Sequence, residues 1–257
     1  MSLHLIRQAH EILLDSVRGK DSMPGQFRNT QNWIGPLGAR IERATFIPPT
    51  PMRLNDHMEN LDSYLANQDE DEIVQAAVID AQFELIHPFC NGSGRLGRML
   101  IPLFLYSRGV LAFPSFYLSE YFEDHRDQYI GRRQALSEDA DWHGWVRFFL
   151  EAVVEQADKN TEKAKGVHQL HETMKRKLDK SRSIYAMRVL DGLFYLGAFT
   201  SRQLVEYTGI SRDSAMRFIR NLRKDGTLKP IQEKAGPRGA VLVFTELVNL
   251  VEGRDVV

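Results

Sequence analysis

Residues 87–98 read HPFCNGSGRLGR, and this stretch decides the fold that we expect around it. Residues 71–86, just before it, carry apolar side chains at the three- and four-residue spacing of a helix. A second apolar helix is expected over about residues 94–107. The sequence therefore predicts two helices joined by a glycine-rich turn.

The composition of this turn indicates a site for a phosphate-bearing ligand. Gly92 and Gly94 allow positive φ angles and a close approach of a ligand to the backbone. Backbone N–H groups at a helix N-terminus attract anions, and Arg95 and Arg98 are spaced to present two guanidinium groups on one face. His87 adds a base that titrates near neutral pH. The coincidence of these residue types favours a polyphosphate site with a base over an ordinary turn with a buried histidine.

Residues 92–97 also match G-x-G-x-x-G, the fingerprint of dinucleotide-binding βαβ units. That fingerprint needs a strand before it and an acidic residue about 20 positions later. Here the preceding segment has helical periodicity, and no acidic residue follows until Glu120. The match is therefore discounted.

The same stretch resembles the motif of the Fic family, His-x-Phe-x-Asp/Glu-Gly-Asn-Gly-Arg-x-x-Arg. The matching residues are His87, Phe89, Gly92, Gly94, Arg95 and Arg98. The resemblance covers most of residues 5–160. The further segments that resemble the family are residues 18–19, 24–28, 31–35, 46–49, 118–122, 126–129 and 145–150.

The resemblance implies a mainly α Fic-type helical bundle with a small β-hairpin flap over about residues 41–53. It also implies a protein adenylyltransferase, which transfers AMP from ATP to a Ser, Thr or Tyr hydroxyl of a target protein. His87 is then the general base, and Arg98 holds the γ-phosphate. The nucleotide-binding residues implied in this way are Ile47, Pro48, Asn91, Gly92, Ser93, Gly94, Arg95, Arg98 and Tyr129.

Two motif positions depart from the family pattern. Asn91 stands where the family has an acid, and Ser93 stands where it has Asn. The acid normally helps to hold Mg²⁺, a cation that prefers carboxylate and phosphate oxygens. The amide oxygen of Asn91 is expected to hold Mg²⁺ only weakly, so metal-dependent transfer is expected to be weakened.

The family's inhibitory string, Ser/Thr-x-x-x-Glu-Gly/Asn, does not occur in the sequence. The resemblance also implies that the chain begins close to where related proteins have already passed their N-terminal inhibitory helix, so we expect either a short family member or a fragment. If the inhibitory helix is absent, Arg98 is free to bind a γ-phosphate.

Charge is distributed unevenly along the chain. The net charge is −1, from 33 Lys and Arg against 34 Asp and Glu, which argues against a generally basic nucleic-acid coat. Residues 181–257, however, hold 12 basic and 8 acidic residues, a balance of +4. Such a local basic patch indicates an anionic partner, and a solvated helix face is the alternative.

The order of elements expected after residue 181 is typical of a winged helix-turn-helix domain. Helices are expected over residues 183–196, over 201–207 and after Ser211, followed by strands over residues 228–231 and 240–244. Such a domain also accompanies Fic domains in one bacterial subgroup. The candidate DNA-binding residues are Arg212, Arg217, Arg220, Lys224 and Arg238.

Three segments are expected: a Fic-like domain over residues 1–163, a linker helix over residues 164–180 and the winged-helix domain over residues 181–257. The single cysteine, Cys90, fits a reducing compartment, and no apolar run is long enough to span a membrane, so we expect a cytoplasmic protein. The expected partners are a target protein and DNA, and formation of a homodimer is left open. The alternative function is a catalytically degenerate, nucleotide-sensing regulator that binds DNA.

Overall fold

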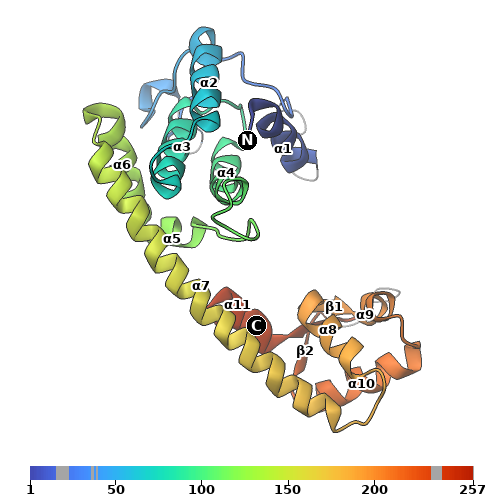
Figure 1. Cartoon of the computed structure of the whole chain (residues 1–257). Coiled ribbons are helices and arrows are strands. Elements are labelled where there is room, and N and C mark those ends of the chain that lie inside the picture. The colour runs from blue at the N-terminus through green and yellow to red at the C-terminus, as the bar shows by residue number, and fades with distance from the viewer. Residues whose placement is uncertain (16–22, 36–37, 39, 233–238, 257) are drawn as a thin grey trace. The chain divides into compact units, whose positions relative to one another are not determined.

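The computed structural model describes residues 1–15, 23–35, 38, 40–232 and 239–256 of the chain, and these residues are mainly helical (Figure 1). Contacts divide the chain into two compact units, Met1–Ala157 and Asp158–Val257. The mainly α fold class expected from the sequence is confirmed. Among the described residues, no helix is both long and apolar enough to span a membrane.

The first unit is a helical bundle. Its elements are α1 (Leu3–Asp15), the 3₁₀ helix η1 (Ile41–Arg43), α2 (Pro51–Ala66), α3 (Glu72–Ile86), α4 (Ser93–Ser107), α5 (Ser119–Asp124), α6 (Arg126–Asp139) and the first part of α7 (Trp142–Asp179). Helix α3 packs against α2 and α4, and α1 packs against α4 (Figure 1). The bundle therefore brings the end of α3 and the start of α4 together beneath α1.

Helix α3 is the centre of this unit. Asp71 caps its start by accepting hydrogen bonds from the backbone N–H groups of Ile73 and Val74. Nine of its 15 residues are buried, so it has core on most sides and not only on one stripe. Two of the buried side chains, Asp80 and Glu84, are acidic and face the region where α3, α4 and α6 meet.

The segment expected to form a hairpin flap over residues 41–53 has a simpler structure. Among the described residues of this segment, an antiparallel bridge joins Ile34 to Phe46, the 3₁₀ helix lies between them, and α2 begins at Pro51. Prolines at positions 48 and 49 remove backbone donors that a second strand would need. We keep the name flap for residues 40–50.

The second unit combines helices with a small sheet. Its elements after α7 are α8 (Ala186–Leu196), β1 (Ala198–Thr200), α9 (Ser201–Thr208), α10 (Arg212–Lys224), β2 (Leu228–Gln232), β3 (Val241–Phe244) and α11 (Thr245–Glu252). The three strands are antiparallel in the order β1-β3-β2. The expected helices and the two expected strands are present, and β1 and α11 are additional.

The final turns of α7 belong to the core of the second unit. Leu170, Met174 and Leu178 are spaced four residues apart and are buried with the apolar side chains of α8 and α10. A Cβ atom at Gly166 would lie 2.8 Å from a side-chain carbon of Leu250, so α11 packs closely on α7 at this glycine. The segment at residues 164–180, which is polar in sequence, is thus mostly the end of α7, where one apolar face is buried and the other face is polar.

Candidate active site

The glycine-rich turn between α3 and α4 has a positive φ at Gly92, which the sequence allows for, whereas Gly94 lies within α4. His87 ends α3 in the left-handed region, with φ 46°, and Gly92 precedes α4 with φ 82°. For a histidine this conformation is strained and costs about 1 kcal/mol or more, so its surroundings must hold it. The turn therefore places the His87 side chain and the start of α4 next to each other.

Arg28, a residue that the sequence did not single out, holds this turn to the flap. Its side chain is buried, and its guanidinium donates hydrogen bonds to backbone carbonyl oxygens of His87, at 2.9 Å, and of Pro49. It also donates to the carbonyl oxygens of Ile86 and Thr30, each at 3.3 Å. One buried cation thus fixes the strained end of α3 and the flap to each other.

His10 of α1 holds the other side of the turn. The backbone N–H of Gly25 donates to His10 Nδ1 at 2.9 Å, so Nε2 carries the proton and donates to the carbonyl oxygen of Asn91 at 2.8 Å. The imidazole also stacks on Phe89, with ring centroids 3.7 Å apart. Burial lowers the pKa of His10 and favours this neutral form.

The start of α4 presents cationic groups and backbone donors. A Cβ atom at Gly92 would lie 3.6 Å from Arg95 Nη2, and one at Gly94 would lie 3.5 Å from Arg98 Nη1. Both guanidinium groups therefore fold back along the glycines, and neither forms a hydrogen bond or ion pair with the rest of the described chain. The first N–H groups of a helix also lack partners within the helix. This arrangement suits a polyphosphate.

The Ser93 side chain faces inward and not toward the guanidinium groups of Arg95 and Arg98. Its hydroxyl is buried, accepts a hydrogen bond from the backbone N–H of Phe89 at 3.0 Å and lies 3.2 Å from the Phe89 carbonyl oxygen. The side chain closes the turn on itself, which leaves the backbone of Ser93 as the part that can meet a ligand.

His87 sits between buried charges. Its Nδ1 atom lies 3.9 Å from Glu84 Oε2, and the same carboxylate oxygen lies 3.2 Å from Arg133 Nη2. Burial is the main reason that the pKa of His87 is lowered, Arg133 and Arg28 lower it further, and Glu84 opposes the shift. The imidazole is therefore neutral at pH 7 and can accept a proton.

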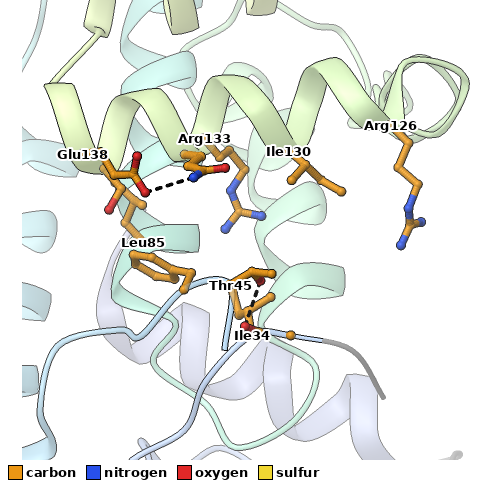
Figure 2. Close-up of a pocket in the computed structure, with 11 residues that line it drawn as sticks. Ile34, Thr45, Leu85, Arg126, Ile130, Arg133 and Glu138 are labelled. Atoms are coloured by element: carbon orange, nitrogen blue, oxygen red, sulfur yellow. Dashed lines mark hydrogen bonds between the residues drawn. The ribbon is translucent and has the colours of Figure 1, made fainter. Parts of the chain in front are cut away.

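A cavity of about 360 Å³ lies between the flap and α6. Its lining residues are Ile34, Gly35, Thr45, Phe46, Leu85, Arg126, Ile130, Arg133, Gln134, Ser137 and Glu138. Figure 2 shows Arg133 extending from α6 toward the side on which Thr45 and Ile34 lie. Because Arg133 also pairs with Glu84, the cavity wall is in direct contact with the surroundings of His87.

None of the nine nucleotide-binding residues named from the resemblance lines this cavity, and Ile47, Pro48 and Tyr129 are among those that do not. Tyr129 is buried and stacks on Phe122, with ring centroids 4.7 Å apart, whereas its neighbour Ile130 faces the cavity. Ile47 is 53% exposed, Pro48 is buried, and the flap residues that reach the cavity are Thr45 and Phe46.

The described residues do not form a metal site by themselves. They contain no group of three or more His, Cys, Asp or Glu side chains that could hold a metal ion. Asn91 is exposed, and its side chain offers one neutral amide oxygen. A Mg²⁺ ion does not fit this donor set without oxygens from a nucleotide.

In the second unit, α10 exposes a basic face. Its exposed basic residues are Arg212, Arg217, Arg220, Arg223 and Lys224, and none of them pairs with a carboxylate of the described chain. Ala215, Phe218, Ile219 and Leu222 form the opposite, buried face. Arg238, the remaining candidate, lies outside the described residues.

Comparisons with known proteins agree with the fold and the motif. The model of the Fic/DOC family matches residues 1–105. A probable protein adenylyltransferase of Aquifex aeolicus is 35% identical over 69 residues, and Protein adenylyltransferase Fic of Nematostella vectensis is 29% identical over 132 residues. These matches cover 26% and 50% of this chain, but only 22% and 26% of the relatives' own lengths.

A solved structure extends the likeness of the fold. The crystal structure of a Fic family protein from Desulfovibrio desulfuricans G20 matches 95% of this chain and 68% of that chain, with a TM-score of 0.53 and 21% identity. Fold and motif thus define a helical domain of the Fic type. The Fic/DOC family model matches residues 1–105, which lie in the first unit, so this part of the chain is similar to that family.

Proposed function

We propose that this protein is an adenylyltransferase that moves AMP from ATP to a Ser, Thr or Tyr hydroxyl of a target protein. The observation that carries the proposal is the buried His87 imidazole, whose pKa burial lowers, at the end of the turn that leads to the Arg95 and Arg98 guanidinium groups of α4. The names of the two relatives, both adenylyltransferases, support the same reaction.

The proposed reaction assigns a task to each part of the turn. His87 accepts the proton of the acceptor hydroxyl, whose oxygen attacks the α-phosphorus of ATP. The bond between the α-phosphorus and the bridging oxygen breaks, and pyrophosphate leaves with that oxygen. The amides at the start of α4 and Arg95 hold the phosphates, and Arg98 holds the γ-phosphate. Positioning and charge stabilisation supply most of the rate in phosphoryl transfer, and we expect the same here.

The cavity between the flap and α6 is the proposed place for the nucleoside. It is large enough for a base, and it offers apolar surface from Leu85, Ile130 and Phe46 beside polar side chains. Contacts of Ile47, Pro48 and Tyr129 with the nucleotide stay predictions. The exposed edge of the flap, near Ile47, is the proposed place for the target chain.

Transfer of a label from α-³²P-ATP tests this proposal. Self-labelling, or labelling of proteins from the source cell, should occur with the parent chain and disappear with His87→Ala. His125→Ala is a matched control, because His125 stacks on Tyr121 away from the motif and should leave labelling intact. Labelling that persists in His87→Ala would contradict the assignment of the base.

The exposed basic face of α10 supports a second candidate function. A nucleotide-sensing regulator would bind DNA through Arg212, Arg217, Arg220 and Lys224 and would not transfer AMP. Asn91 favours this candidate, because the motif lacks its acid, whereas the neutral His87 favours the enzyme. The winged-helix interpretation of the second unit is part of this candidate.

A further inference from the structure

Glu84 lies one helical turn before His87 and has its carboxylate turned inward. The side chain is 3% exposed, and its Oε2 atom lies between His87 Nδ1 and Arg133 Nη2, at 3.9 and 3.2 Å. The reaction proposed above uses the imidazole but gives this carboxylate no part. A buried acid that faces both the base and the cavity wall needs its own explanation.

The backbone of α4 is shaped to admit this carboxylate. A Cβ atom at Gly97 would lie 2.8 Å from Glu84 Oε1, closer than real Cβ contacts come, and one at Gly94 would lie 3.4 Å away. Glycine at position 97 therefore lets Glu84 occupy its place under the first turns of α4. The Oε1 atom has no hydrogen-bond partner among the described atoms, so burial of this group is not offset by a full set of bonds.

His87 has a ring nitrogen that needs a partner. Its Nδ1 atom is buried without a hydrogen bond of ordinary geometry, and the acceptors near it are the backbone carbonyl oxygen of Glu84 and Glu84 Oε2. A neutral imidazole carries its proton on one nitrogen, and the hydrogen bond at that nitrogen determines which of the two remains basic. Closing the gap by about 1 Å gives a hydrogen bond, and catalytic contacts often shorten in this way when substrate binds.

We propose that Glu84 is a positioning residue that holds His87 in the tautomer protonated at Nδ1, with Arg133 anchoring the carboxylate. Nε2 is then unprotonated, as acceptance of the hydroxyl proton requires. The proposal rests on the function proposed above, because it concerns the same proton transfer. Arg133 also lines the cavity, so a ligand bound there would contact the residue that holds the Glu84 carboxylate in place.

The charged groups that face His87 come from three segments. Glu84 belongs to α3, Arg133 to α6 and Arg28 to the segment before the flap. Burial is the largest cause of the lowered pKa of His87, both arginines add to it, and Glu84 acts against it. Removing the charge of Glu84 should therefore lower the pKa of His87 further.

The test reads the tautomer of His87 directly by ¹⁵N NMR of the full chain labelled at histidine, with signals assigned through His87→Ala. The parent should show His87 protonated at Nδ1 at pH 7.5. In Glu84→Gln the two tautomers should mix and the pKa of His87 should fall. The kcat for transfer should fall about 100-fold or more, while KM for ATP stays within about threefold.

Three further variants separate positioning from packing. Glu72→Gln changes an acid at the other end of α3 and should leave the His87 signals unchanged. If Glu84→Gln fails to fold because Arg133 is left unpaired, the double variant Glu84→Gln/Arg133→Gln removes both charges and should fold. It should show the same mixed tautomers, and Glu84→Asp should restore part of the preference for Nδ1.

The inference fails if the parent carries the proton at Nε2, or if the tautomer and pKa of His87 are unchanged in a folded Glu84 variant. In that case Glu84 only neutralises Arg133. Because the NMR measurement needs no nucleotide, absence of AMP transfer in the parent would count against the proposed function alone.

Discussion

At the scale of single residues, His10, Arg28 and Glu84 lie outside the motif and yet hold it in place. Arg28 bonds the carbonyl oxygen of His87, His10 bonds that of Asn91, and Glu84 faces the imidazole itself. Each is buried, so its polar groups were desolvated on folding and are costly to leave unbonded. Removing one partner should therefore affect both stability and the geometry of the turn.

His10→Ala tests this coupling. The change leaves the Gly25 N–H and the Asn91 carbonyl oxygen without their partner and opens a cavity beside Phe89. We expect a loss of about 1–3 kcal/mol in the free energy of unfolding, measured by urea denaturation, and weaker binding of ATP, measured by calorimetry. His4→Ala alters an exposed histidine of the same helix and should change neither quantity. Equal effects of the two variants would contradict the role given to His10.

Asn91→Asp restores the acid of the family motif. The side chain of Asn91 is exposed, whereas the contact with His10 uses its backbone oxygen, so the change should leave the turn intact. A carboxylate adds a charged oxygen ligand for Mg²⁺. Transfer of labelled AMP should rise in the presence of Mg²⁺ and show a steeper dependence on its concentration. Unchanged incorporation at every Mg²⁺ concentration would rule out this explanation of the motif.

Asp80 gives a prediction about pH. Burial, and then the nearby Glu84 carboxylate, raise the pKa of Asp80 from 3.8 to about 7, although Arg133 and Arg98 oppose the shift. Between these values the folded state holds a proton that the unfolded state has lost. Stability therefore falls as pH rises from about 4 to 7, by at most about 1.4 kcal/mol per pH unit for this group.

Asp80→Asn removes this ionisable group while keeping nearly the same shape. The variant should gain stability over the parent as pH rises through this range, with the largest gain at pH 7 and above. Denaturation midpoints at several pH values measure the effect, and Asp56→Asn, at an exposed position of α2, is the control. A parent and variant with parallel pH profiles would show that Asp80 is ionised in the folded protein.

At the scale of elements, a glycine of α4 and a glycine of α6 should respond in opposite ways to substitution by alanine. Gly97 faces Glu84, with no room for a methyl group, whereas a Cβ atom at Gly131 would meet nothing within 4 Å. Gly131→Ala should stabilise the protein by about 0.5–1 kcal/mol through helix propensity. Gly97→Ala should destabilise it by about 1–3 kcal/mol, because Glu84 or the helix must move.

Chemical denaturation measures the free energy of unfolding of both alanine variants and so tests the two predictions side by side. The prediction concerns sign as well as size, so it does not depend on an absolute free energy. If Gly97→Ala proved as stabilising as Gly131→Ala, the close approach of Glu84 to α4 would be wrong. The positioning role of Glu84 would lose its structural basis at the same time.

The sequence alone was sufficient to predict those helices that long periodic patterns of apolar residues specify. Helices α3 and α4 follow from apolar spacing, and the turn between them follows from the glycine at position 92. Strand β1 has three residues, which is too few for a pattern to develop, and it forms because β3 pairs with it. The flap likewise depends on the bridge between Ile34 and Phe46, which no local pattern predicts.

The candidate site was predictable only in part. The motif supplied His87, Arg95 and Arg98, because their spacing is local. The contacts of Arg28 and Glu84 depend on how the flap and α6 approach the motif, which the sequence does not encode locally. For His10 a signal did exist: Ile6, His10 and Leu14 lie four residues apart, and all three are buried. A histidine on an apolar stripe needs polar partners, and here the motif provides one.

At the scale of the whole molecule, charge separates the two ends of the sequence. The net charge is −1, whereas residues 181–257 alone carry +4, and α10 exposes basic side chains without carboxylate partners in the described chain. A patch of this kind on a near-neutral protein gives binding to polyanions that weakens with salt. The DNA-binding candidate can therefore be tested without knowing a specific sequence.

Arg217→Glu and Arg220→Glu test that candidate on the full chain. If α10 contacts DNA phosphates, each variant should weaken binding to a mixed-sequence duplex at least tenfold and reduce the dependence of affinity on salt. Arg254→Glu makes the same change of charge near the C-terminus and is the control. Fluorescence anisotropy measures the binding. Duplex affinity that is absent in the parent, or the same in all three variants, would remove DNA as a partner of α10.

The central claim is that the turn between α3 and α4 holds the phosphates of ATP with the α-phosphorus next to His87. A crystal structure with a non-hydrolysable ATP analogue measures this most directly. We predict phosphate oxygens against the first amides of α4 and the guanidinium groups of Arg95 and Arg98, with His87 Nε2 on the open side of the α-phosphorus. Phosphates bound elsewhere, or an imidazole whose Nε2 points into the core, would contradict it.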